Sequence, residues 1–189
     1  MQYDHIYIND QQVPRAVAPL FQHVIDTYAG ETNKTASVWS MFANADLAWR
    51  PHPRSSTVGE ILQHQLLSER RFFAAFLGSP EPPAATVLPA AREIEALTRR
   101  FVELAAARLP WLSGLGEAEW LQVTDFFDVR RERIWIFWRR VLHSAHHRTQ
   151  LTVYLRLLDR TVPPTYGPTA DVTWRGADPT LTVESAGRR

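Results

Sequence analysis

Apolar side chains recur at steps of three and four residues along four long stretches of this chain. These stretches cover about residues 14–43, 57–77, 90–109 and 129–159. Such steps are the period of an amphipathic helix, and no stretch alternates apolar and polar residues as a half-buried strand would. The pattern therefore predicts an all-α fold in which four helices pack as an antiparallel bundle.

Several residues mark where these helices should begin, bend or end. Thr57 and Glu60 have the Thr-x-x-Glu spacing of a capping box, in which each side chain accepts a hydrogen bond from a free backbone N–H of the first turn. Gly78, followed by Ser-Pro, is a usual stop signal. Pro110 is expected to close the third helix, and Gly30 allows the first to break or bend.

The chain is long enough for one domain with a tail, because it has 189 residues. Residues 1–160 are expected to form the bundle, with a loop over residues 111–128 that has either a short helical turn or an extended piece. Residues 161–189 are rich in proline and glycine and read as an irregular tail. Its first half, which contains Tyr166 and Trp174, is expected to pack on the bundle, and its last ten or so residues to be mobile.

Composition narrows the choice of partners. Lys and Arg together number 21 and Asp and Glu 20, so the chain lacks the basic surplus of a nucleic-acid-binding protein. The arginines between residues 130 and 140 are interrupted by Glu132 and large apolar residues, which favours a solvated helix face over phosphate binding. There is no cysteine, so a thiol could take part only as a co-substrate.

Neither a secretory signal nor a membrane span is expected. The first residues, MQYDHIYIND, lack a basic segment followed by an apolar run. No uninterrupted apolar segment reaches the length needed to cross a bilayer. These features predict a cytoplasmic protein with no membrane partner.

Histidine spacing supplies the candidate chemistry. His143 and His147 are four residues apart in the fourth predicted helix, which places both imidazoles on one face, where they can bind a single metal ion. His64, in the second predicted helix, could supply a third ligand. A lone histidine is more often a core or surface residue than a metal ligand. We interpret His5, His23 and His52 in this way.

Three further polar residues share faces with these histidines, and each has two interpretations. Glu60 either caps the helix or acts near the metal, orienting His64 or taking a proton. Gln150 either bonds a ligand histidine or substrate, or makes a plain hydrogen bond between helices. Arg148 either anchors an anionic substrate group or pairs with a carboxylate such as Glu69 or Asp159.

The aromatic run at residues 134–138, IWIFW, is apolar on all sides of its predicted helix. One side should face the core. The excess on the other side indicates an interface, and it favours a homodimer.

These segments together resemble the DinB-like (DinB/YfiT) metalloprotein superfamily. WRPHP at residues 49–53 is similar to its Trp-x-Pro segment, and TVGEILQH at residues 57–64 to its Ser/Thr-x-Gly-Glu-x-x-x-His segment. HSAHHRTQ at residues 143–150 is similar to its His-x-x-His-His-Arg-Gly-Gln segment. The likeness spans about residues 15–171. Thr149 departs from the usual glycine, which predicts a slightly wider helix spacing or a narrower pocket.

The resemblance implies a four-helix bundle with one unusual crossover, commonly a homodimer. It implies a divalent metal, nickel or zinc, on three histidines, which by position are His64, His143 and His147, with His146 as a non-ligand. The function it favours is a metal-dependent enzyme that acts on a small-molecule substrate, either as a transferase using a low-molecular-weight thiol or as a hydrolase. The alternatives are a non-catalytic metal-binding stress-response protein and a metal-free structural bundle.

Overall fold

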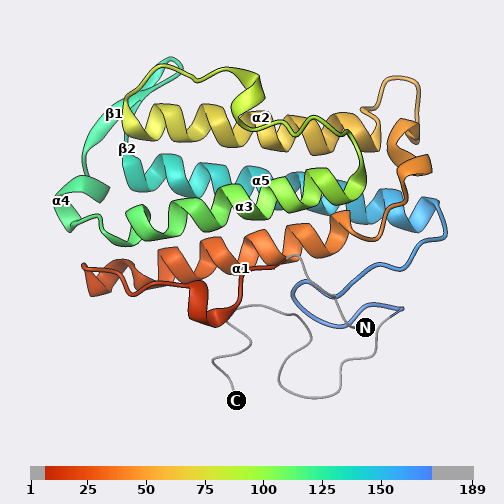
Figure 1. The fold of residues 1–189 in the computed structure, drawn as a ribbon, viewed down its shortest axis with the longest axis horizontal. Coiled ribbons are helices and arrows are strands. Elements are labelled where there is room, and N and C mark those ends of the chain that lie inside the picture. The colour runs from red at the N-terminus through yellow and green to blue at the C-terminus, as the bar shows by residue number, and fades with distance from the viewer. Residues whose placement is uncertain (1–6, 172–189) are drawn as a thin grey trace.

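Four long helices dominate the computed structural model, which describes residues 7–171 (Figure 1). Their bounds are α1 Gln22–Trp39, α2 Val58–Leu77, α3 Ile94–Ser113 and α5 Arg133–Leu157. The shorter elements are the 3-10 helices Asp10–Gln12, Pro19–Phe21, Asn44–Ala48 and Ala84–Thr86, the single turn α4 Glu117–Trp120, and the strands β1 Val123–Phe126 and β2 Val129–Glu132. The prediction of an all-α fold built on four helices is confirmed.

The order of the helices in space differs from their order in the chain. α1 packs mainly against α3 and α5, and α2 packs mainly against α5. α1 and α2 follow one another in sequence but share few contacts, so the segment between them crosses the end of the bundle (Figure 1). This arrangement brings α2 and α5 together, the two helices on which the candidate metal ligands lie.

The ends of α2 follow the sequence signals. The Thr57 hydroxyl accepts a hydrogen bond from the Glu60 backbone N–H at 3.2 Å, and the Glu60 carboxylate accepts one from the Thr57 N–H at 2.7 Å. Gly78 ends the helix with φ +65°, a left-handed conformation that glycine adopts without strain. α2 is therefore closed at both ends by the residues that the sequence marks.

Several predicted helix boundaries were wrong, including the end of the first helix, at Trp39 rather than near residue 43, and the start of the third, at Ile94 rather than near residue 90. α1 begins at Gln22, not near residue 14, because the preceding chain turns through the 3-10 helix Pro19–Phe21; it then runs without interruption through Gly30. α3 continues past Pro110 to Ser113, whose hydroxyl donates to the Pro110 carbonyl at 2.8 Å.

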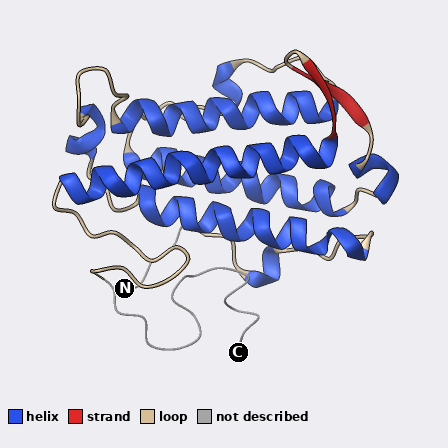
Figure 2. Ribbon diagram, turned by 180° about the vertical axis from the view of Figure 1, so that it is seen from behind, coloured by secondary structure: helices blue, strands red, loops and turns tan. Residues whose placement is uncertain are grey.

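The fourth helix begins at Arg133 rather than near residue 129, because the preceding residues form an antiparallel hairpin. Val123 pairs with Glu132 and Phe126 with Val129, which leaves a two-residue turn (Figure 2, red). The hairpin packs on α2 and α5. The extended piece expected as one alternative in this region is thus half of a small sheet.

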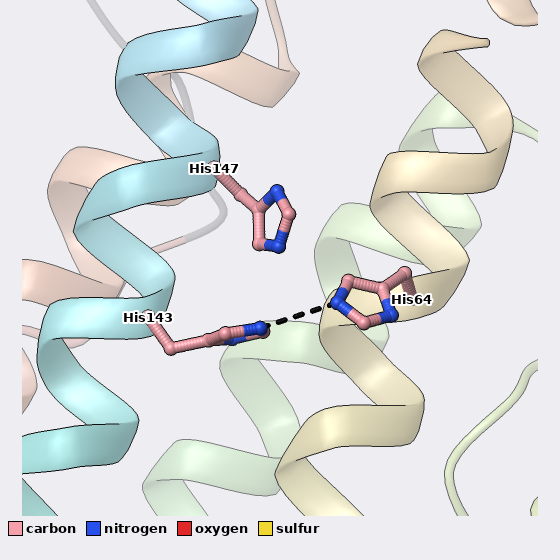
Figure 3. A group of neighbouring side chains, drawn as sticks. All are labelled: His64, His143 and His147. Atoms are coloured by element: carbon pink, nitrogen blue, oxygen red, sulfur yellow. Dashed lines mark hydrogen bonds between the residues drawn. The ribbon is translucent and has the colours of Figure 1, made fainter. Parts of the chain in front are cut away.

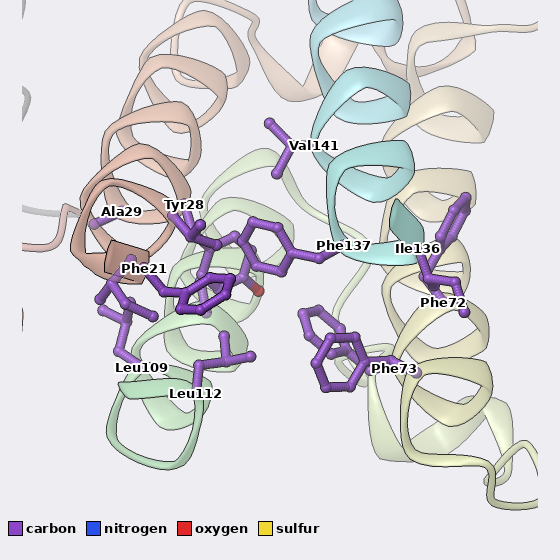
Figure 4. Packing of buried hydrophobic residues seen from close by; sticks show 14 of the residues in the cluster. Phe21, Tyr28, Ala29, Phe72, Phe73, Leu109, Leu112, Ile136, Phe137 and Val141 are labelled. Atoms are coloured by element: carbon purple, nitrogen blue, oxygen red, sulfur yellow. The ribbon is translucent and has the colours of Figure 1, made fainter. Parts of the chain in front are cut away.

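The core has two apolar clusters at different heights along the bundle. One is built around Phe73 and Phe137 (Figure 4) and also includes Phe76 and Trp120. The other is built around Trp39. Between them, α2 and α5 bury polar side chains: Gln65, Ser68, Glu69, Arg140, Ser144 and Arg148. Burying polar groups is unfavourable unless each finds a partner, so this central polar layer indicates a functional or specificity role.

No helix within residues 7–171 is both long and apolar enough to cross a membrane. Trp174 and the last residues of the tail, for which packing and mobility were predicted, lie outside the described part of the chain, as does His5.

Candidate metal centre

Three histidine rings converge between α2 and α5 (Figure 3). His143 and His147 extend from successive turns of α5, and His64 faces them from α2. One nitrogen of each ring lies within 4.8 Å of one nitrogen of both others. The structure thus brings together the three residues that the sequence pattern and the resemblance singled out.

The spacing of these nitrogens suits a metal ion. The Nε2 atoms of His64 and His143 are 3.2 Å apart. Two nitrogens that each lie 2.0–2.1 Å from a tetrahedral ion are about 3.3 Å apart, so the observed separation leaves room for such an ion. Within residues 7–171, no other histidine or carboxylate joins this group.

A hydrogen bond orients the His147 ring. Its Nδ1 lies 3.2 Å from Gln150 Oε1, which can only accept, so Nδ1 carries the proton and Nε2 keeps its lone pair. The amide nitrogen of Gln150 donates to the Tyr154 hydroxyl at 3.1 Å, and that hydroxyl donates to the Ser56 carbonyl at 3.1 Å. This chain of hydrogen bonds supports the ring as the outer partners of metal-bound histidines do.

The His143 ring lacks an outer hydrogen bond of this kind. Its Nδ1 is buried and has no hydrogen-bond partner within the described residues. The ring is held instead by packing: its centroid lies 5.5 Å from that of Phe72 and 4.6 Å from that of His147. The donor set therefore suits a metal ion, with one ring fixed by aromatic contacts rather than by an outer hydrogen bond.

All three rings favour the neutral form that metal binding requires. Burial, reinforced by the positive charge of Arg140, lowers the pKa of His143 to about 3. Burial is also the largest cause that lowers the pKa of His64 and of His147, although the hydrogen bond to Gln150 acts in the opposite direction on His147. Unprotonated imidazoles are thus present at neutral pH.

The charge of Arg140 is balanced by a buried carboxylate behind the cluster. Glu69 is 1% exposed, and its carboxylate accepts a hydrogen bond from Arg140 Nε at 2.6 Å, pairs with Arg108 at 3.0 Å and accepts another from the Tyr28 hydroxyl. The two arginines keep the pKa of Glu69 below its usual range, although burial acts to raise it. This network joins all four long helices beside the histidines.

A cavity of about 490 Å³ opens beside the cluster. His64 and His143 form part of its wall. The other lining residues come from α2, α5 and the hairpin: Ser68, Arg71, Phe72, Phe126, Phe127, Asp128, Val129, Trp135 and Arg139. The volume is in the range of small-molecule sites.

Comparison with known proteins gives the family of the chain and supports its fold. The model of the DinB family matches residues 15–176. The chain belongs to the DinB family. Two solved structures of DinB-like proteins have the same fold, each with 19% sequence identity over 76% of this chain. The protein from Bacillus cereus ATCC 10987 aligns over 95% of its length with a TM-score of 0.66, and the one from Bacillus subtilis over 97% with a TM-score of 0.64. No protein of curated function matches the chain.

The structure also shows what Glu60 and Thr149 of this DinB-family chain contact. Glu60 is exposed, and its carboxylate caps α2, which lowers its pKa. Thr149 is also exposed, and its hydroxyl donates to the Ala145 carbonyl at 3.0 Å, so the expectation that it would crowd a neighbouring helix or the pocket was wrong.

Arg148 is buried in an ion pair, but its partner is neither of the carboxylates expected. It is 2% exposed, and its guanidinium donates to Glu31 on α1 at 2.7 Å and to the Tyr166 hydroxyl at 2.5 Å. The Tyr166 hydroxyl donates in turn to Glu31 at 2.8 Å. The expected pairing with Glu69 or Asp159 was therefore wrong. Arg148 instead links the segment around Tyr166 to α1.

The sequence analysis did not predict which residues line the cavity. Arg71 and Arg139 lie on exposed helix positions, and Phe127 lies in a turn, so no local pattern joins them. The position of Arg140 beside the histidines could have been predicted, because it precedes His143 by three residues and therefore lies on the same face of the helix.

Proposed function

We propose that this DinB-family protein is a metal-dependent enzyme in which His64, His143 and His147 hold one divalent ion, nickel or zinc. The reaction is a transfer to or from a low-molecular-weight thiol, or a hydrolysis, on a small-molecule substrate. The observation that carries the proposal is the convergence of three imidazoles, two of which, His64 and His143, line a cavity large enough for a substrate.

The number of protein donors favours turnover over storage. A sequestering site would close the coordination shell with a fourth side chain, and Glu60 and His146 were the candidates for it. The Glu60 carboxylate is hydrogen-bonded at the start of α2. The His146 ring meets the His147 ring edge-on, with 5.0 Å between the centroids, and does not join the donor group. Three protein ligands leave a position for substrate, as in catalytic zinc sites.

The chain's own residues supply orientation and charge. Gln150 fixes the tautomer of His147, so that Nε2 is the free donor. The Ser68 hydroxyl lies 3.5 Å from His64 Nε2 and also lines the cavity, where it can bond a ligand. When bound, a divalent ion would supply Lewis-acid chemistry, which lets a thiol or water lose its proton near neutral pH.

Elemental analysis and turnover assays test the proposal together. The untagged protein should contain about one nickel or zinc ion per chain. It should then consume a low-molecular-weight thiol with an electrophile, or cleave an ester or amide, only while the metal is present. Stable metal binding without turnover on either substrate series would instead support the alternative of a non-catalytic metal-binding stress-response protein.

The predicted homodimer and the cytoplasmic location remain proposals. Large apolar side chains are exposed along α5, namely Leu142, Val153 and Leu157, and they support an interface on that helix. Sedimentation equilibrium of wild type and of Leu142→Glu would test the dimer.

A further inference from the structure

The wall of the cavity is a continuous row of aromatic rings that starts at the histidine cluster. The Phe72 ring lies 5.5 Å from the His143 ring and 5.2 Å from the Phe126 ring, measured between centroids. Phe126 in turn lies 4.7 Å from Phe127 and 5.7 Å from Trp135. The row therefore offers a flat or apolar body a surface that ends at the candidate metal ligands.

Two of these rings are exposed in spite of their size. Phe127 is 70% exposed and Trp135 is 38% exposed, and both line the cavity. Phe127 also has φ +53°, a conformation that bulky residues rarely adopt. Strained backbone of this kind concentrates at ligand sites, where the surrounding structure holds a side chain in a required position.

The charged residues of the cavity lining are mostly cationic. Arg71 on α2 and Arg139 on α5 line it, against one acidic residue, Asp128. Arg71 pairs with Glu81 at 3.2 Å, whereas Arg139 has no hydrogen bond or ion pair within residues 7–171. A divalent ion on three neutral histidines would keep both of its positive charges, which strengthens the preference for an anion.

We propose that the cavity binds an amphipathic carboxylate, whose aromatic or other apolar body lies on the rings of Phe72, Phe126, Phe127 and Trp135 and whose acid group is held by Arg139 and Arg71. A guanidinium suits this role because its fork of N–H donors matches a carboxylate. The volume of about 490 Å³ accommodates a two-ring acid. Only the placement of the ligand's reacting group at the histidine cluster rests on the proposed function.

Two probes of matched shape separate the contribution of charge from that of apolar contact. 2-Naphthoate carries the acid, and 2-naphthalenemethanol is its neutral counterpart. Their dissociation constants would be measured by calorimetry for wild type, for Arg139→Gln with Arg71→Gln, and for Phe127→Ala, with and without added zinc. Arg99→Gln is the control, since it removes an exposed arginine of α3 that does not line the cavity.

Naphthoate should bind wild type more tightly than the alcohol. The double arginine variant should lose about tenfold in naphthoate affinity and little in alcohol affinity, because it loses charge-assisted hydrogen bonds but keeps the rings. Phe127→Ala should weaken both probes, and Arg99→Gln neither.

Equal binding of the two probes by wild type would overturn the inference. So would naphthoate binding that survives the double variant, including binding that depends on zinc alone, because the metal and not the arginines would then hold the acid. Zinc content is measured on the same samples. A wild-type protein that retains no zinc contradicts the proposed function, whereas one that retains zinc without preferring the acid contradicts only this inference.

Discussion

His147 donates a hydrogen bond from Nδ1 to the Oε1 atom of Gln150, three residues further along α5, at 3.2 Å. The bond leaves Nε2 of His147 as the nitrogen that faces His64 and His143 (Figure 3). Gln150 is itself held by Tyr154, so the ring has little freedom to turn away. Gln150 thus determines which ring nitrogen of His147 faces the other two histidines.

Replacing Gln150 by Leu should therefore weaken zinc or nickel binding without abolishing it. Loss of the outer partner of a metal-bound histidine lowers metal affinity about 10- to 100-fold. Competition with a chromophoric chelator measures this affinity. Gln150→Glu keeps an acceptor for Nδ1 and should restore most of it; if both variants bind metal as wild type does, the hydrogen bond has no orienting role.

Glu60 should prove to be a helix cap rather than a catalytic group. Gln can replace Glu in a capping box, so Glu60→Gln should keep the stability, the metal content and the activity of wild type. Thr57→Ala is the matched variant, since it breaks the same box while keeping the carboxylate; loss of such an N-cap costs about 1 kcal/mol. Thermal unfolding and turnover separate the two roles, and a stable Glu60→Gln protein without activity would assign Glu60 to the chemistry.

The buried carboxylate of Glu69 should contribute strongly to stability. Glu69→Gln leaves Arg140 and Arg108 facing a neutral amide in the core, and breaking a buried pair in this way costs about 3–5 kcal/mol. Glu95→Gln removes an exposed partner of Arg99 and should cost less than about 1 kcal/mol. Urea unfolding compares the two, and equal effects would show that the Glu69 network does not support the fold.

The metal-free protein should lose stability as the pH falls below 6.5. The pKa of His143 is lowered to about 3 in the folded state, while an unfolded histidine titrates near 6.5. Between these values the unfolded chain binds more protons than the folded one, so stability rises with pH across this window. Because carboxylates also titrate there, His143→Gln is the reference.

Urea unfolding at pH 7 and at pH 5 should therefore show a smaller decrease for His143→Gln than for wild type. An identical decrease in the two proteins would mean that His143 is not held neutral by its surroundings.

Local and periodic features of the sequence were sufficient to predict much of the structure. The bundle follows from apolar periodicity, the ends of α2 from Thr57, Glu60 and Gly78, and the pairing of His143 with His147 from their spacing on one helix face. Each of these depends on residues within one element, which is why a single sequence can reveal it.

Features that depend on residues far apart in the chain could not be predicted from local sequence patterns. The partner of Arg148 is Glu31, 117 positions away, and nothing near Arg148 indicates it. The hairpin was missed because Phe127 occupies the positive-φ position of its turn, where glycine, asparagine or aspartate would have been the usual signal. The cavity joins α2, α5 and this hairpin, so its lining appears only once they are packed together.

The most direct test of the three-histidine site is elemental analysis of the purified, untagged protein beside His143→Ala, after dialysis of both against nickel and zinc. We expect about one ion per wild-type chain, little or none in the variant, and similar helix content by circular dichroism, since His143 lies outside both apolar clusters. A wild-type protein that retains no metal, or a folded variant that retains as much as wild type, would contradict the assignment of His64, His143 and His147 as a metal centre.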